Sequence, residues 1–174
     1  VIALFNPSIK EGVRTLRSAV IAKAIPPWTL FAGMLGGSFV AVQTHIVPLI
    51  GVAIYSVAAI AGQSAISLLV DRVGLTGGGK KQITPRRVTA AFVTVFAVFI
   101  SVADRLDGRD LSIAAVFLGV LAGAIVGVQR ALNGQINEHS HQSFTTSLLN
   151  FAMGTIFLLI ILLFAMTLGG MKLS

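Results

Sequence analysis

The fold is decided by one long stretch of sequence, AIPPWTLFAGMLGGSFVAVQTHIVPLIGVAIYSVAAIAGQSAISLLV (Ala24–Val70). Its 47 residues include no Asp, Glu, Lys or Arg. One helix crosses the hydrocarbon core of a bilayer with about 20 apolar residues, so the stretch is long enough for two crossings. Pro48 and Gly51 interrupt the helical pattern near its middle and mark a tight connection. The stretch therefore predicts two membrane-spanning helices, near 29–46 and 50–70.

The rest of the chain is also poor in charge. Of its 174 residues 55% are hydrophobic and 11% are charged, and the mean hydropathy is +0.91. A soluble domain carries about a quarter charged residues and needs them to stay dispersed in water. Here 13 basic and 6 acidic side chains would have to cover the whole exterior, which is too few. We therefore expect an all-α polytopic membrane protein whose solvent is the lipid bilayer.

Three further uncharged runs predict three more spans, at Val88–Ala103, Leu111–Gln129 and Gln142–Met171. The first of these has only 16 residues, and flanking arginines can reach the membrane surface to extend it. Val1–Phe5 resembles the end of another span. The chain is thus expected to hold five complete spans and one remnant.

The segment between the remnant and the first full span has a different pattern. In Ser8–Ile25 apolar residues recur at helical spacing among basic ones, which is typical of a helix lying in the membrane interface. Trp28 follows two prolines and fits the aromatic belt at which the next span enters the bilayer.

Basic residues concentrate in two connections and predict the orientation. Residues 6–28 hold four and residues 71–87 hold five, and two spans separate these segments, so both lie on one side. The excess of Lys and Arg in cytoplasmic loops places both in the cytoplasm of a cell inner (plasma) membrane. Parity then places Asp104–Asp110 outside and Arg130–Gln142 inside. This confinement to loops also argues against a nucleic-acid partner.

Two predicted helices carry polar stripes at i+4 spacing. They are Tyr55, Ala59, Gln63, Ser67 and Asp71 on the helix at 50–70, and Gln129, Asn133 and Asn137 on a helix at 113–137. A side-chain amide facing hydrocarbon is expensive, so both stripes should face the bundle interior or a wet cavity. The functional interpretation is a substrate path lined by five of them, Gln63, Ser67, Tyr55, Gln129 and Asn133, with Asp71 and Asn137 at helix ends. The alternative is interhelical hydrogen bonding that only holds helices together.

Small residues form two seams, Gly36–Gly37 and the series Gly119, Gly123 and Gly127. The i+4 spacing of the series allows helix backbones to approach closely. We interpret these glycines as packing positions. The same seams would also let helices slide during a transport cycle.

No pattern indicates an enzyme, a metal or a cofactor. The chain has no cysteine, and His45, His139 and His141 fall in predicted connections without partner carboxylates. Gly74–Lys81 nearly matches the phosphate-binding loop of nucleotide-binding proteins. Lys81, however, stands where that motif needs the Ser or Thr that holds Mg²⁺, and no strand precedes it. We interpret this segment as a flexible basic loop.

Several motifs resemble one family of membrane proteins. Pro27-Trp28, Gly36-Gly37 and Ala61-Gly62-Gln63, followed by Ser67 and Asp71-Arg-Val-Gly74, are similar to the later helices of a YdcZ-type five-helix unit. Gly127-Val-Gln129-Arg-Ala-Leu-Asn133 and Asn150-Phe-Ala-Met-Gly154 are similar to the opening two helices of a second unit. The YdcZ family belongs to the drug/metabolite transporter superfamily, whose fold is EamA-like.

The resemblance implies a division of the chain. Residues 1–110 would be the C-terminal four helices of the first unit, the first of them only a remnant, and residues 111–174 the first two helices of the second. Because five spans are an odd number, the second unit would run inverted, as in many transporters. The chain would then be an inverted repeat truncated at both ends.

The resulting hypothesis is a transporter that moves a small, hydrogen-bonding solute across the inner membrane by alternating access. The alternative is a non-transporting membrane scaffold or assembly subunit. Besides the bilayer and the solute, a second copy of the chain or the missing helices are the expected partners. Proton-coupled carriers usually place Asp or Glu inside the membrane, and these spans hold none, so we expect no proton relay here.

Overall fold

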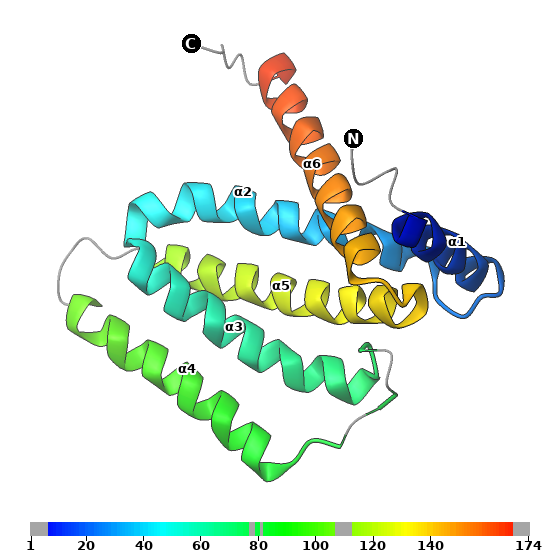
Figure 1. The fold of residues 1–174 in the computed structure, drawn as a ribbon. Helices are drawn as coiled ribbons and strands as arrows, with labels where there is room; N and C mark the ends of the chain where they lie inside the picture. The colour runs from blue at the N-terminus through cyan, green and yellow to red at the C-terminus, as the bar shows by residue number, and fades with distance from the viewer. Residues whose placement is uncertain (1–6, 77–78, 81, 107–112, 169–174) are drawn as a thin grey trace.

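The computed structural model describes residues 7–76, 79–80, 82–106 and 113–168, and within these residues the secondary structure is helical throughout (Figure 1). Of residues 98–99 and 101–106 it describes the backbone alone. The elements are α1 (Pro7–Ile21), the 3₁₀ helix η2 (Pro27–Phe31), α2 (Ala32–Ile50), α3 (Val52–Val73), α4 (Pro85–Leu106), α5 (Ile113–Ser140) and α6 (Ser143–Leu168). The predicted remnant at Val1–Phe5, the centre of the Asp104–Asp110 loop and the tail lie outside the described residues.

Among the residues that the structure describes, four helical segments are long and apolar enough to cross a bilayer. They are Pro27–Ile50, Val52–Val73, Ile113–Ser140 and Ser143–Leu168, and the span predicted at Val88–Ala103 is not one of them. A soluble bundle hides its apolar side chains from water, whereas here leucines and phenylalanines such as Leu159 and Phe164 are more than half exposed. The prediction of an all-α polytopic membrane protein is confirmed.

The connection between the first two spans is shorter than predicted. α2 continues through Pro48 to Ile50, and Gly51 alone separates it from α3. Proline in the last turn of a helix removes a single backbone hydrogen bond, so the helix tolerates it there. Gly51 ends the helix because its φ is +82°, a conformation that residues with a Cβ rarely adopt.

The connection predicted at Arg130–Gln142 is helical for most of its length, whereas the helix predicted at 113–137 is confirmed and extends further. α5 continues to Ser140, and only His141 and Gln142 separate it from α6. Arg130 is exposed on this helix while Ile136 beyond it is buried, so the arginine marks a change of environment rather than the end of the helix.

Two histidines predicted in connections lie in helices instead. The Nδ1 atoms of His45 in α2 and His139 in α5 are each 2.9 Å from the carbonyl oxygen four residues earlier. His141 does lie in a connection, with φ of +53°. α4 is also longer than its uncharged run, because its 22 residues include Arg86 and Arg87 in the first turn.

The long helix α5 lies at the centre of the bundle. α3 packs along one side of it and α2 along another, while α4 packs on the outer side of α3 (Figure 1). α6 crosses α2 and then projects beyond the other helices (Figure 1). Its buried residues, Thr145 and Thr146, lie in its first turn.

The two basic segments lie at the same end of the bundle. Leu16 of α1 and Leu75, which follows α3, both pack in the apolar cluster around Ile136 of α5. The Nε2 of Gln135 donates a hydrogen bond of 2.7 Å to the Leu75 carbonyl. α1 buries one face and exposes its basic residues, as expected for an interfacial helix. That this end faces the cytoplasm remains a prediction.

Candidate functional site

The polar stripe of α3 faces the interior of the bundle. The side chains of Tyr55 and Asp71 at its two ends are almost fully buried, and Gln63 and Ser67 between them are half-buried. Ala59, at the middle of the stripe, is also buried. The stripe lies inside the protein because its central part packs on α5.

The contact between α3 and α5 is made by backbones. A Cβ placed on Gly123 would lie 2.0 Å from the carbonyl oxygen of Ala59, and one on Gly62 would lie 1.9 Å from that of Val120. Real Cβ atoms do not approach other atoms so closely, so neither glycine can be replaced without moving a helix. The seam therefore has no room for a solute between its backbones.

The other two glycines of the seam frame polar residues of the stripe. Gly119 faces Ala58 and the ring of Tyr55, and Gly127 lies 3.5 Å, measured from its ideal Cβ, from the Cα of Gln63. The Tyr55 ring also packs on Phe39, with 5.7 Å between centroids. Its hydroxyl is buried and has no hydrogen-bond partner among the described residues.

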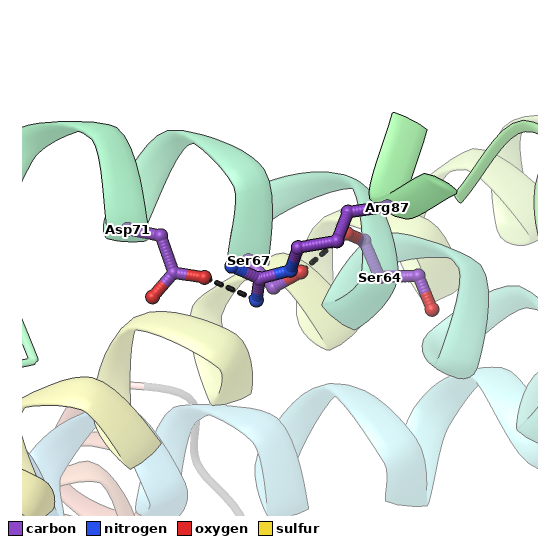
Figure 2. Close-up of polar contacts among 4 residues, drawn as sticks. All are labelled: Ser64, Ser67, Asp71 and Arg87. Carbon is purple, nitrogen blue, oxygen red and sulfur yellow. Dashed lines mark hydrogen bonds and ion pairs between the residues drawn. The ribbon is translucent and has the colours of Figure 1, made fainter. Parts of the chain in front are cut away.

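Ser67 and Asp71 lie where α3 meets α4 (Figure 2). The Ser67 hydroxyl donates a hydrogen bond of 2.7 Å to the carbonyl of Ser64 in its own helix. The Asp71 carboxylate forms an ion pair with Arg87 from the first turn of α4. Arg87 is partly exposed while Asp71 is buried, so this pair closes the outer edge of α3 at the basic end.

Polar side chains from two helices meet on the opposite face of α5. The Nε2 of Gln129 donates a hydrogen bond of 2.7 Å to the Oδ1 of Asn150 in α6. The Nδ2 of Asn133 donates to the same oxygen at 3.1 Å. We call Gln129, Asn133 and Asn150 the amide cluster. One acceptor thus takes two donors, while the Oδ1 of Asn133 is buried without a partner among the described residues.

Glycines of α2 make room for the amide cluster. A Cβ on Gly36 would lie 2.4 Å from the Nε2 of Gln129, and one on Gly33 would lie 2.2 Å from the Asn150 carbonyl oxygen. Gly37 packs in the same way on Gly154 of α6, because a Cβ on Gly37 would lie 3.0 Å from the Gly154 carbonyl oxygen. A larger residue at any of these positions would displace the amides or separate α2 from α6.

A groove of about 220 Å³ runs between α2 and α6 beside the amide cluster. Backbones of Gly33, Gly36 and Gly37 form one wall. Asn150 and Thr155 contribute polar groups from the other wall, and none of the lining residues is ionisable. A cavity of about 150 Å³ holds a molecule the size of benzene, so the groove fits a small solute.

One family model matches nearly the whole chain. Its description is "Putative inner membrane exporter, YdcZ", and it covers residues 8–100 and 114–173. The chain belongs to the YdcZ family. Neither a curated protein nor a solved structure gives a match. The resemblance seen in the sequence is thereby confirmed, and the family's description is that of a transporter and not of an enzyme.

The structure brings together only part of the path expected for this YdcZ-family chain. Gln129 and Asn133 meet in the amide cluster, but Gln63 lies across the α5 backbone, on the side of Gly127. Gly127 and Gln129 are two residues apart on α5, and residues at this spacing point in nearly opposite directions from a helix. Tyr55 lies on the Gln63 side, Ser67 lies where α3 meets α4, and Asn137 is exposed near the end of α5.

Asn150 was missing from the predicted path, although it supplies the acceptor on which the cluster depends. The sequence did hold a signal for Asn150, because this residue is an amide within the apolar run at Gln142–Met171. It has no second amide at i+4, and a stripe on α6 was therefore not apparent. In the part of the chain that the structure describes, no three His, Asp or Glu side chains gather as they would at a metal site.

Proposed function

We propose that this YdcZ-family chain moves a small, uncharged, hydrogen-bonding solute across the inner membrane by alternating access, with the amide cluster contacting the solute. The observation that carries the proposal is Asn150. Its Oδ1 accepts from both Gln129 and Asn133, so the amide is held in a single orientation with its Nδ2 left to donate.

The surroundings of Asn150 favour a transported solute over a permanent partner. The residue lines the groove between α2 and α6, where the glycine wall leaves space beside it. An amide in a membrane-spanning segment is costly unless it finds a partner, and such groups commonly mark solute pathways. An amide donor with no charge nearby suits a hydroxyl or carbonyl group on a neutral solute.

The rest of the stripe has a supporting part in the same proposal. Gln63 and Tyr55 of α3 face α5 on the side away from the amide cluster, and Ser67 lies on the α4 side of α3, so these three would contact the solute only if α3 moves at another stage of the cycle. Because α3 and α5 touch through glycines, they can slide without changing side-chain rotamers. Polar groups on the two sides of α5 could then contact the solute at different stages, as alternating access requires.

The scaffold alternative makes a different prediction for Asn150→Ala. If the amides only hold helices together, the variant loses folded protein, because Gln129 and Asn133 then lack their acceptor. If they contact solute, a folded variant loses transport. We expect at least about a tenfold loss of efflux, which corresponds to one hydrogen bond to the solute.

The experiment expresses the protein in cells that are challenged with a panel of toxic neutral solutes, and measures efflux of those to which it gives tolerance. The matched control is Thr167→Ala on the same helix, where the hydroxyl bonds only to carbonyls of α6. Folding is checked by size-exclusion chromatography of each purified variant. An Asn150→Ala protein that is folded and still exports the solute at the normal rate contradicts the proposed site.

A further inference from the structure

The segment after α3 forms a basic pocket that the proposed transport path does not use. The pocket has a volume of about 550 Å³ and is lined by Arg72, Lys80, Gln82 and Ile83. Pockets that bind small molecules in proteins commonly measure about 300–1,000 Å³, so this volume is sufficient for a ligand. The lining combines two cations with an amide and one apolar side chain.

The backbone that carries the pocket is held at several points. Gly74 ends α3 in the left-handed conformation, with φ of +76°, and Leu75 donates a backbone hydrogen bond to Val70. Gln135 of α5 bonds to the Leu75 carbonyl. The chain then returns so that the backbone nitrogen of Lys80 lies 3.1 Å from an ideal Cβ on Gly74. Lys80 is thereby brought back beside the end of α3, near Arg72.

No carboxylate among the described residues forms an ion pair with the cations of the pocket. Residues 71–87 contain five basic residues and one acidic residue, Asp71. Arg87 takes that single carboxylate, as Figure 2 shows. Among the described residues neither Arg72 nor Lys80 has an ion-pair partner. Two exposed cations therefore share one pocket, and no residue that the structure describes pairs with either of them.

We infer that this pocket binds the phosphate group of an anionic phospholipid at the membrane surface. It lies directly beyond the end of α3, which is where the headgroups lie if α3 crosses the membrane. Ile83 in its lining and Val73 at the end of α3 are exposed apolar residues that suit the start of an acyl chain. Arg and Lys bind phosphate oxygens, and basic pockets at the ends of spanning helices bind anionic headgroups. Gln82 can donate to the same oxygens or to a headgroup hydroxyl.

The same phosphate chemistry could come from a free anion, so the test must separate the two sources. The protein is purified in detergent and stripped of lipid. Phosphatidylglycerol, phosphatidylcholine and inorganic phosphate are then added in separate titrations, and bound lipid is counted by native mass spectrometry. Thermal stability is followed in the same samples. We expect one phosphatidylglycerol to bind with higher affinity than phosphatidylcholine, and inorganic phosphate to have no stabilising effect.

The decisive variant is R72Q/K80Q, and its matched control is R14Q/R17Q. The control removes the same charge from α1 at the same end of the bundle. Loss of two cations from the pocket should weaken phosphatidylglycerol binding at least about tenfold, while the control binds as the unaltered protein does. If R72Q/K80Q does not fold, K80Q alone serves, because Lys80 is exposed beyond the end of α3.

Three outcomes overturn the inference. Equal weakening in R72Q/K80Q and R14Q/R17Q would mean that general surface charge holds the lipid. Stabilisation by inorganic phosphate as strong as that by phosphatidylglycerol would mean a free-anion site instead of a lipid site. Unchanged phosphatidylglycerol affinity in K80Q would exclude Lys80, and with it the pocket.

Discussion

At the scale of single residues, two buried polar arrangements differ in what their chemistry supports. The amide cluster joins neutral groups, so each member can exchange a protein partner for a solute group at little electrostatic cost. Asp71 and Arg87 instead form an ion pair in which the carboxylate is buried. Removing either partner leaves an uncompensated charge on the other. The pair is therefore a structural contact, and neither member is free to exchange its partner for a solute group.

We therefore predict that Arg87→Gln destabilises the protein. It leaves the buried Asp71 carboxylate without its partner, at a cost of about 1–3 kcal/mol for an unsatisfied buried group. The measurement is the apparent melting temperature in detergent. The double variant D71N/R87Q should recover part of the loss, because it removes both charges. A melting temperature for Arg87→Gln equal to that of the unaltered protein would show that the pair contributes nothing.

At the scale of helices, much of the architecture could be predicted from charge-free runs, and the errors lie at helix ends. The uncharged stretch Ala24–Val70 contains α2 and most of α3, as expected. Pro48 was interpreted as the end of a helix, and the charge of Arg130 as the start of a connection, although the polar stripe already indicated a helix to residue 137. A helix that leaves the hydrocarbon can continue in the interface, where its backbone remains hydrogen-bonded and an arginine is solvated.

The pairing of helix faces was beyond the reach of the sequence. The periodicity of α5 showed a glycine series and an amide series, but not which neighbour each would face. In the structure the glycines of α5 pack against α3, and the amides of α5 bond to α6. Both choices depend on contacts between residues far apart in the chain, and a single sequence holds no direct record of these.

The glycine seam between α3 and α5 supplies a prediction at this scale. Gly123→Ala should lower the melting temperature, because the new Cβ would lie 2.0 Å from the carbonyl oxygen of Ala59 and would push the two helices apart. Overpacking of this kind costs about 1–3 kcal/mol. The measurement is thermal unfolding of the purified protein in detergent.

Gly134→Ala is the matched control on the same helix. An ideal Cβ at Gly134 meets only the carbonyl oxygen of Thr76, at an ordinary distance of 3.6 Å. Alanine is also favoured over glycine within a helix, by about 0.5–1 kcal/mol. We expect this variant to melt at the same or a higher temperature. Equal melting of the two variants would contradict the close backbone contact.

At the scale of the whole molecule, the two ends of the bundle differ in charge. Among the described residues, the basic side chains of α1 and of the segment after α3 lie at the end where the helices α5 and α6 are joined. The turn at Gly51 lies at the other end. This asymmetry is the reason that orientation can be predicted, although the structure itself contains no membrane.

Cysteine labelling tests the orientation. The chain has no cysteine, so single substitutions Gly79→Cys, His141→Cys and Val52→Cys carry no background. In intact cells an impermeant maleimide should label Val52→Cys, which is exposed beside the turn at Gly51, and leave the other two unlabelled until the membrane is broken. Labelling of Gly79→Cys from outside would reverse the assignment, and different results for Gly79→Cys and His141→Cys would contradict the packing of the bundle.

The single-residue turn at Gly51 restricts which helix is free to swing. α2 and α3 are linked by Gly51 alone, so a tilt of α2 away from the groove would also move α3, which packs on α5 through backbone contacts. α6 packs on α2 at Asn150 and Gly154, but its residues beyond Leu158 are mostly exposed, and its covalent link to α5 is the pair His141–Gln142. In the proposed transport cycle, widening of the groove would therefore fall to α6, acting as an arm hinged at one membrane face.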